Sequence, residues 1–308
     1  MKSWGAMYVS YRKFFIALSL ILAGCLLAAG QAGRRPTNSR DRATTLNIVA
    51  MREDGSRAPI TSKELAIYDD GIEQNIQNLI PDTGPARIVL LFDNSLSLRT
   101  DIPKLASVAR EFAFEIYEGD QLLIAGFDER AEQLSADWTD KTKDVEEAIA
   151  LLRKKGDPHL FDAVNDVIEV ALRPLTGSNR KRIIVLIGDG LDRGSNVKFK
   201  DLLAELQKSD ITVYALQIPD RTGGAYRRDR PKPTQVVQQL VEGTGGRLLP
   251  LDQPGESAKS ICDELRKNRY LLSYAPTALP YSEARRLLIV GNPGINVRYK
   301  SAQPPNNK

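Results

Sequence analysis

An aspartate and two serines, spaced at alternate positions after one apolar run, could together bind a metal ion. Residues 88–92 are apolar, and they are followed by Asp93, Ser95 and Ser97. One carboxylate and two hydroxyl groups on a short loop provide three hard oxygen donors, which suit Mg²⁺ or Mn²⁺ and are poor ligands for zinc or copper. The sequence therefore predicts a divalent-cation site in this D-x-S-x-S loop.

The elements that must position this loop form an alternating pattern. The run at 88–92 has no polar alternation, which is typical of a strand buried on both faces of a parallel sheet. Similar runs occur at residues 122–127, 183–187 and 213–218. Amphipathic helical patterns separate them, and Asp101 with Pro103 marks the start of the first helix. This alternation predicts an α/β fold with a doubly wound, mainly parallel sheet.

A second carboxylate ends another of these runs. Asp189 follows the apolar residues 183–187 and lies between two glycines. Taken alone, an aspartate at a strand end is more often a helix cap or a turn residue. However, the carboxyl ends of neighbouring parallel strands meet at one edge of a sheet, which is where such sheets bind ligands. We therefore expect Asp93 and Asp189 to lie together.

The main domain is expected at residues 87–253, with a short edge strand at 131–134. Before it, residues 43–83 predict a small β-rich module that is too short to fold alone and should pack against the main domain. After it, residues 254–300 predict a helix and strands that extend or flank the main sheet. The polar, proline-rich tail at 301–308 is predicted to be disordered.

Residues 1–32 have the pattern of a signal peptide. Basic residues precede an apolar run at 14–29, which is short for a membrane span. The sequence Leu-Ala-Gly-Cys ending at Cys25 matches a bacterial lipobox, in which the cysteine is lipidated, whereas ordinary cleavage after Ala32 is the rival. An uncleaved anchor is a third alternative. We expect an exported protein, either in the cell envelope (periplasmic or lipid-anchored) or secreted.

The bulk composition excludes some classes of function. The net charge is +4, and Lys2, Arg12 and Lys13 of the signal segment contribute most of it, so the remaining chain is nearly neutral and nucleic-acid binding is not expected. Cys25 and Cys262 are the two cysteines. If Cys25 is removed or lipidated, no internal disulfide can form, and Cys262 is expected to be a buried thiol on an apolar helix face.

The D-x-S-x-S pattern with Asp189 resembles the metal-ion-dependent adhesion site of von Willebrand factor type A (vWA) domains. Further stretches are similar to exported bacterial vWA proteins, especially the acidobacterial vWA-related group: residues 65–74, 244–247, 261–266 and 270–276. The resemblance implies that Ser95 and Ser97 bind the cation directly and that Asp93 and Asp189 hold it directly or through water. An Asp or Glu of a protein partner would then fill an open coordination position.

One loop departs from the family pattern. The family's third loop reads like Gly-Gly-Thr-Ala-Leu-Tyr-Asp-Ala and its threonine binds the metal, whereas residues 156–163 here place Pro158 at that position. Proline has no side-chain donor. Asp157 is expected to substitute as a ligand, and the alternative is a metal-free vWA scaffold with a vestigial site. Asp162 is expected to have a structural role in this loop.

A basic loop comes after the run at 213–218. It contains Arg221, Arg227, Arg228, Arg230 and Lys232. Because it leaves the carboxyl end of a strand, it should stand on the metal-site side of the sheet, where it could steer an acidic partner. The alternative is a solvated loop with no partner.

The sequence favours binding over catalysis. Phosphatases of the haloacid-dehalogenase type need a second acid two residues after the nucleophilic aspartate, where this chain has Ser95. His159 is the single histidine, and no G-x-S-x-G motif, P-loop, dinucleotide fingerprint or His/Cys zinc site accompanies it. We predict a protein-binding module that is not an enzyme, with a Mg²⁺-dependent phosphatase as the enzymatic alternative.

Overall fold

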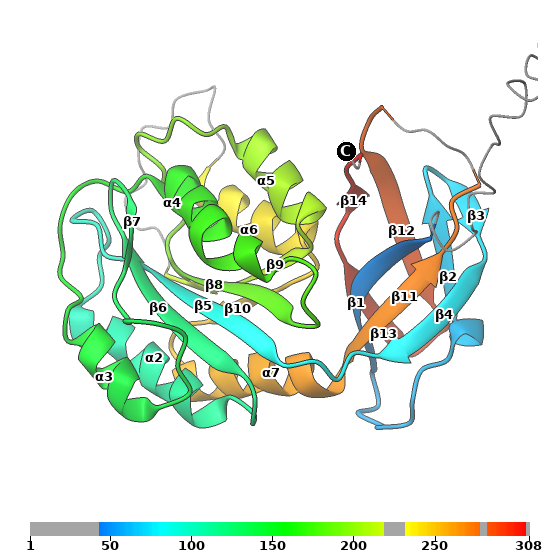
Figure 1. The fold of residues 1–308 in the computed structure, drawn as a ribbon, viewed down its shortest axis with the longest axis horizontal. Helices are drawn as coiled ribbons and strands as arrows, with labels where there is room; N and C mark the ends of the chain where they lie inside the picture. The colour runs from blue at the N-terminus through cyan, green and yellow to red at the C-terminus, as the bar shows by residue number, and fades with distance from the viewer. Residues whose placement is uncertain (1–42, 219–231, 278–281, 306–308) are drawn as a thin grey trace, which may run out of the picture. The chain divides into compact units, whose positions relative to one another are not determined.

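The computed structural model describes residues 43–218, 232–277 and 282–305, and it combines one parallel and two antiparallel sheets (Figure 1). Residues from 43 onward form one compact unit. The signal segment with Cys25 lies outside the described residues, as do Arg221, Arg227, Arg228 and Arg230. The predicted α/β fold with a mainly parallel sheet is confirmed.

The parallel sheet has six strands in the order β10-β9-β8-β5-β6-β7. Their bounds are β5 (Ala86–Asp93), β6 (Gln121–Phe127), β7 (Ala131–Gln133), β8 (Lys181–Gly188), β9 (Ile211–Gln217) and β10 (Leu248–Pro250). Strand β5 pairs in parallel with β6 on one side and β8 on the other, and all 8 of its residues are buried. Strand β7 is the short edge strand that the sequence predicted, and it pairs antiparallel with β6.

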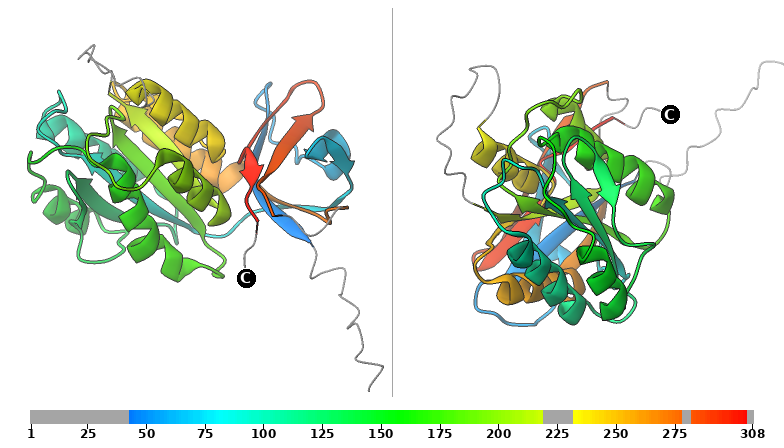
Figure 2. Two further views of the ribbon diagram at one scale, coloured as in Figure 1. Left: turned by 90° about the horizontal axis from the view of Figure 1, so that it is seen from above. Right: turned by 90° about the vertical axis from the view of Figure 1, so that its left-hand side faces the viewer.

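Helices cover both faces of this sheet, which is the doubly wound arrangement (Figure 2). Their bounds are α2 (Ile102–Glu115), α3 (Thr142–Ile149), α4 (Leu160–Val167), α5 (Phe199–Lys208), α6 (Pro233–Gly243) and α7 (Pro254–Lys267). Leu90 and alternate β5 residues share a core with α2, α3 and α7, whereas Leu91 and its alternates share one with α4, α5 and α6. Asp101 caps α2 by accepting a hydrogen bond from the Lys104 amide at 3.0 Å.

The antiparallel strands form two four-stranded sheets, ordered β13-β1-β11-β4 and β14-β12-β2-β3. The strands are β1 (Thr44–Arg52), β2 (Leu65–Asp69), β3 (Ile72–Gln74), β4 (Ile76–Pro81), β11 (Arg269–Tyr274), β12 (Arg285–Gly291), β13 (Ile295–Tyr299) and β14 (Ala302–Gln303), with a short helical turn η2 (Ser62–Glu64). Strands from residues 43–83 therefore pair with C-terminal strands, and Leu46, Ile67 and Leu272 share one core. In the described residues, the C-terminal strands do not join the parallel sheet.

The prediction of a disordered tail at 301–308 is wrong for its first residues. Gln303 pairs with Arg285 and Ala302 with Arg286 in the β12–β14 ladder, and the Gln303 side chain is buried. Two backbone pairs and one buried amide are enough to order a short polar segment that has no hydrophobic pattern.

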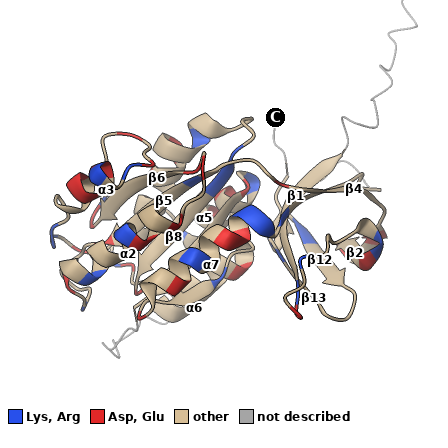
Figure 3. Cartoon of the chain, turned by 90° about the horizontal axis from the view of Figure 1, so that it is seen from below, with Lys and Arg blue, Asp and Glu red and all other residues tan. Residues whose placement is uncertain are grey.

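The buried carboxylate of Glu264 on α7 links this helix to β9 of the parallel sheet and to β13 of an antiparallel sheet. The Glu264 side chain is 2 % exposed, accepts a hydrogen bond from the Tyr214 hydroxyl of β9 at 2.5 Å, and forms ion pairs with Arg247 at 3.2 Å and with Arg298 of β13. Burial and the nearby Glu264 charge raise the pKa of Tyr214 well above its usual range. Helix α7 also carries charged residues of both signs (Figure 3), of which Glu256, Lys259 and Arg266 are exposed.

We expect Glu264→Gln to destabilise the fold by about 3 kcal/mol, because removing one partner of a buried ion pair leaves uncompensated charge. Urea unfolding followed by circular dichroism measures this loss. The matched control is Glu256→Gln at an exposed position of the same helix, which should change stability by less than about 0.5 kcal/mol. Equal effects of the two substitutions would contradict the assigned role of Glu264.

Candidate functional site

The carboxyl ends of β5 and β8 bring Asp93 and Asp189 to the same edge of the parallel sheet (Figure 1). Both residues are buried, with exposed fractions of 1 % and 4 %. Gly188 permits the close approach of the two strand ends, because a Cβ atom at this position would lie only 2.9 Å from the Cβ atom of Asp93. Two carboxylates therefore meet at the edge where the sequence pattern predicted them.

The D-x-S-x-S loop folds back toward these carboxylates. Asp93 Oδ1 accepts a hydrogen bond from the Ser95 amide at 2.9 Å, and the Ser95 and Ser97 hydroxyl oxygens are 3.1 Å apart. Asp189 Oδ1 accepts a hydrogen bond from the Leu191 amide at 2.8 Å. The backbone amide two residues after each aspartate thus orients its carboxylate, and the Ser95 and Ser97 hydroxyl groups lie next to each other.

The Asp93 carboxylate is buried close to a second carboxylate, that of Asp189. Burial raises the pKa of Asp93 to about 6; hydrogen bonds from Ser95 lower it, and the neighbouring charge of Asp189 raises it. A buried carboxylate of this kind is stabilised by a bound cation. Two carboxylates with two hydroxyls match the oxygen donors that Mg²⁺ and Mn²⁺ prefer, so these residues fit such an ion.

Lys154 is a residue of the site that sequence reasoning missed. Its ammonium nitrogen donates hydrogen bonds to the carbonyl oxygens of Ser95 and Leu98, each at 2.9 Å. Partial burial lowers the pKa of Lys154, whereas the charges of Asp93 and Asp189 raise it. No local motif marks this lysine, because its role depends on how the segment before Gly156 packs against a loop distant in sequence.

The third loop is held by contacts of its own. The carbonyl of the buried Pro158 accepts a hydrogen bond from the Arg193 amide at 2.8 Å, and the Asp157 carboxylate lies 3.2 Å from the Arg193 guanidinium. The Asp157 side chain is 59 % exposed. Within the described residues, no group of three or more acidic, histidine or cysteine side chains could hold a metal ion. The structure therefore does not bring Asp157 together with Asp93 and Asp189.

Asp162 fixes the loop after β8 to the start of α4. Its carboxylate accepts hydrogen bonds from the Asn196 amide at 3.0 Å and the Val197 amide at 2.8 Å. In return, the Ser195 hydroxyl accepts hydrogen bonds from the first amides of α4, including that of Asp162 at 3.1 Å. These contacts are the structural role that we expected for Asp162.

A hollow of about 470 Å³ opens beside Ser97 at the rim of the site. Its lining consists of Leu96, Ser97, Arg99, Glu129, Gly156, Asp157 and Arg193. Leu96 is 70 % exposed and lies between the buried Ser95 and the half-buried Ser97. The rim therefore combines an apolar side chain with charges of both signs.

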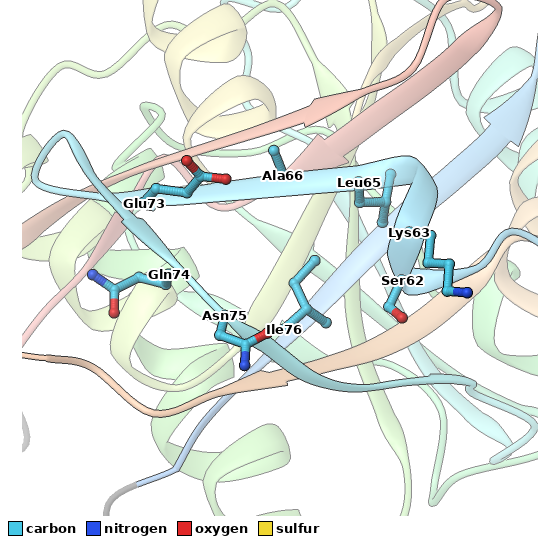
Figure 4. Close-up of a pocket in the computed structure, with 8 residues that line it drawn as sticks. All are labelled: Ser62, Lys63, Leu65, Ala66, Glu73, Gln74, Asn75 and Ile76. Atoms are coloured by element: carbon cyan, nitrogen blue, oxygen red, sulfur yellow. The ribbon is translucent and has the colours of Figure 1, made fainter.

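Other predicted residues lie away from this edge or outside the described part. Of the basic loop, Lys232 is described, and it is exposed directly before α6. Cys262 is a free, buried thiol as expected, and burial raises its pKa. A second hollow, of about 560 Å³, is lined by residues of η2, β2, β3 and β4 (Figure 4). Its charged lining residues are Lys63 and Glu73, which do not form a metal-binding set.

Comparison with known proteins identifies the domain. A family model for the von Willebrand factor type A domain matches residues 88–191, a range that contains Asp93, Ser95, Ser97 and Asp189. No curated protein matches the sequence.

Several solved structures are similar at low identity. An aerotolerance-related membrane protein from Bacteroides fragilis NCTC 9343, carrying multiple mutations to serine, is 19 % identical over 59 % of this chain and 99 % of its own, with a TM-score of 0.45. The conserved hypothetical protein BatB from Bacteroides thetaiotaomicron is 17 % identical over 58 % and 97 %, with a TM-score of 0.44.

A von Willebrand factor type A protein from Catenulispora acidiphila is 9 % identical over 78 % of this chain and 73 % of its own, with a TM-score of 0.48. The family match to residues 88–191 and the doubly wound, mainly parallel sheet show that this protein contains a von Willebrand factor type A domain.

Proposed function

We propose that this protein is an exported binding module that holds Mg²⁺ or Mn²⁺ at Asp93, Ser95, Ser97 and Asp189, and that it recognises an Asp or Glu of a partner protein through that ion. The observation that carries the proposal is the pair of buried carboxylates beside two adjacent hydroxyls at the carboxyl end of the sheet. The family match to this segment supports it.

The ion would supply a positive centre that can accept one more anionic oxygen. In this arrangement Asp93 and Asp189 would balance its charge, while Ser95 and Ser97 would offer neutral oxygens. Because hard cations favour carboxylate oxygen, an acidic side chain of the partner is the ligand that such a centre selects. The chain's own residues bind and orient, and no covalent step is needed.

Two features favour a metal-free scaffold as the second candidate. Pro158 offers no side-chain oxygen at the position of the family's threonine ligand, and Asp157 pairs with Arg193 instead of replacing it. In addition, the Lys154 ammonium already provides positive charge near the two carboxylates. We therefore expect weak metal binding, which makes the affinity the quantity to measure.

Export is part of the proposal and depends on residues 1–32, which lie outside the described residues. The helices of the described part, from residue 43 on, include none with the length and apolar content of a membrane span. The partner-steering role of the basic loop likewise depends on arginines outside the described part, together with the exposed Lys232.

In metal-free protein at pH 7.5, Asp93→Asn should raise the free energy of unfolding by about 3 kcal/mol, since each unit of raised carboxyl pKa corresponds to about 1.4 kcal/mol. The pKa of Asp93 is raised to about 6, so the folded protein binds this proton more tightly than the unfolded chain does. The stability that the wild-type protein gains from this bound proton is present below about pH 4, and it is lost as the pH rises from about 4 to about 6.

Urea unfolding in EDTA at pH 4 and pH 7.5 measures this difference, which should be small at pH 4. The matched control is Asp252→Asn, because the Asp252 side chain is 88 % exposed and should show no such pH dependence. A destabilised Asp93→Asn variant at pH 7.5 would contradict the assignment of Asp93 as a buried charge kept for a ligand.

Calorimetric titration should detect saturable Mg²⁺ binding to the wild-type protein at pH 7.5, with a Kd on the order of 10⁻⁴ to 10⁻³ M. Asp93→Asn should abolish it because the variant lacks one of two charged ligands. Asp157→Asn makes the same chemical change on the exposed rim and should alter the Kd by less than about threefold.

A third variant, Pro158→Thr, restores the hydroxyl that the family uses and should tighten Mg²⁺ binding by about tenfold. If the wild-type protein does not bind Mg²⁺ or Mn²⁺ up to about 10 mM while Pro158→Thr does, the metal site is vestigial. The protein is then a metal-free scaffold, and the proposed metal-dependent recognition is wrong.

A further inference from the structure

The ammonium group of Lys154 joins both ends of the segment that carries the two serines of the site. It donates hydrogen bonds of 2.9 Å to the carbonyl oxygen of Ser95 and of 2.9 Å to that of Leu98. Residues 95–98 thus form a short arc closed by one side chain. Hydrogen bonds from a charged donor are roughly twice as strong as those between neutral groups.

The backbone around Lys154 is itself tied to the D-x-S-x-S loop. The Asn94 side-chain amide donates to the carbonyl of Arg153 at 2.6 Å, and the Lys155 amide donates to the Asn94 carbonyl at 3.0 Å. The Leu96 amide donates to the Gly156 carbonyl at 3.0 Å. Residues 153–156 therefore run beside residues 94–96, so the half-buried Lys154 side chain starts from a fixed position.

We propose that Lys154 is a positioning residue, whose ammonium group holds residues 95–98 in the conformation of the site while no ion is bound. The inference deepens the proposed function and rests on it, because the loop that Lys154 holds is the one that would bind the ion. The buried Leu98 anchors the end of this segment in the core, whereas Ser95, Leu96 and Ser97 are polar or exposed and have little apolar contact. Charge-assisted bonds therefore decide the conformation of these three residues.

In the wild-type protein, residues 95–98 should therefore be ordered whether or not a metal ion is bound. In a variant without the Lys154 ammonium, they should be ordered only when the ion is bound. In the variant Lys154→Met, ordering of residues 95–98 would fall to the ion, through the hydroxyls of Ser95 and Ser97. The wild-type loop, in contrast, is already formed before an ion arrives.

Amide hydrogen exchange of the full chain, followed by NMR in EDTA, tests this proposal. Lys154→Met should accelerate exchange of the Ser95 and Leu96 amides by at least about tenfold, while amides in the middle of β5 keep their wild-type rates. Lys154→Arg, which keeps the charge and donors, should restore most of the protection. The matched control is Lys155→Met, because the Lys155 ammonium pairs with Glu132 at 2.5 Å, outside this loop.

Addition of about 10 mM Mg²⁺ should return the Ser95 and Leu96 amides of Lys154→Met to wild-type rates. Wild-type rates in this variant without metal would overturn the proposal, as would an equal acceleration throughout β5. If the loop loosens but Mg²⁺ does not restore it, the role of Lys154 stands and it is the proposed metal site that fails.

Discussion

The burial of β5 between two parallel neighbours is the constraint on which the rest of the structure depends. Every residue of this strand is buried, including its last, Asp93, so its end cannot be solvated freely. Because β8 runs parallel to it, Asp189 reaches the same edge of the sheet. The D-x-S-x-S loop and the loop after β8 then have to meet there, and the contacts of residues 153–158 close the site between them.

Two buried carboxylates illustrate how this chain treats negative charge. Glu264 is compensated by Arg247 and Arg298, and its role is complete within the fold. Asp93, by contrast, has amide and hydroxyl partners from Ser95, while the nearby Lys154 ammonium donates to backbone carbonyls. A buried carboxylate whose charge is not matched by a direct ion pair costs stability, which is the usual signature of a position kept for a ligand.

The parallel sheet and the two strand-end aspartates could be predicted because both follow from local pattern and one topological rule. The pairing of Leu46 with Leu272, or of Tyr68 with Leu288, could not, since strands distant in sequence carry no local signal of their partner. The roles of Lys154 and Asp157 were likewise beyond prediction. They depend on where side chains point in loops whose packing is set by tertiary contacts.

The most direct measurement is an anomalous difference map from crystals grown with Mn²⁺. We expect one peak about 2.0–2.3 Å from the Ser95 and Ser97 hydroxyl oxygens, next to Asp93 and Asp189, and no peak there in Asp93→Asn crystals. A map with no peak at this edge of the sheet, or with manganese bound solely at exposed carboxylates such as Asp157, would contradict the assignment of this loop as a metal-dependent binding site.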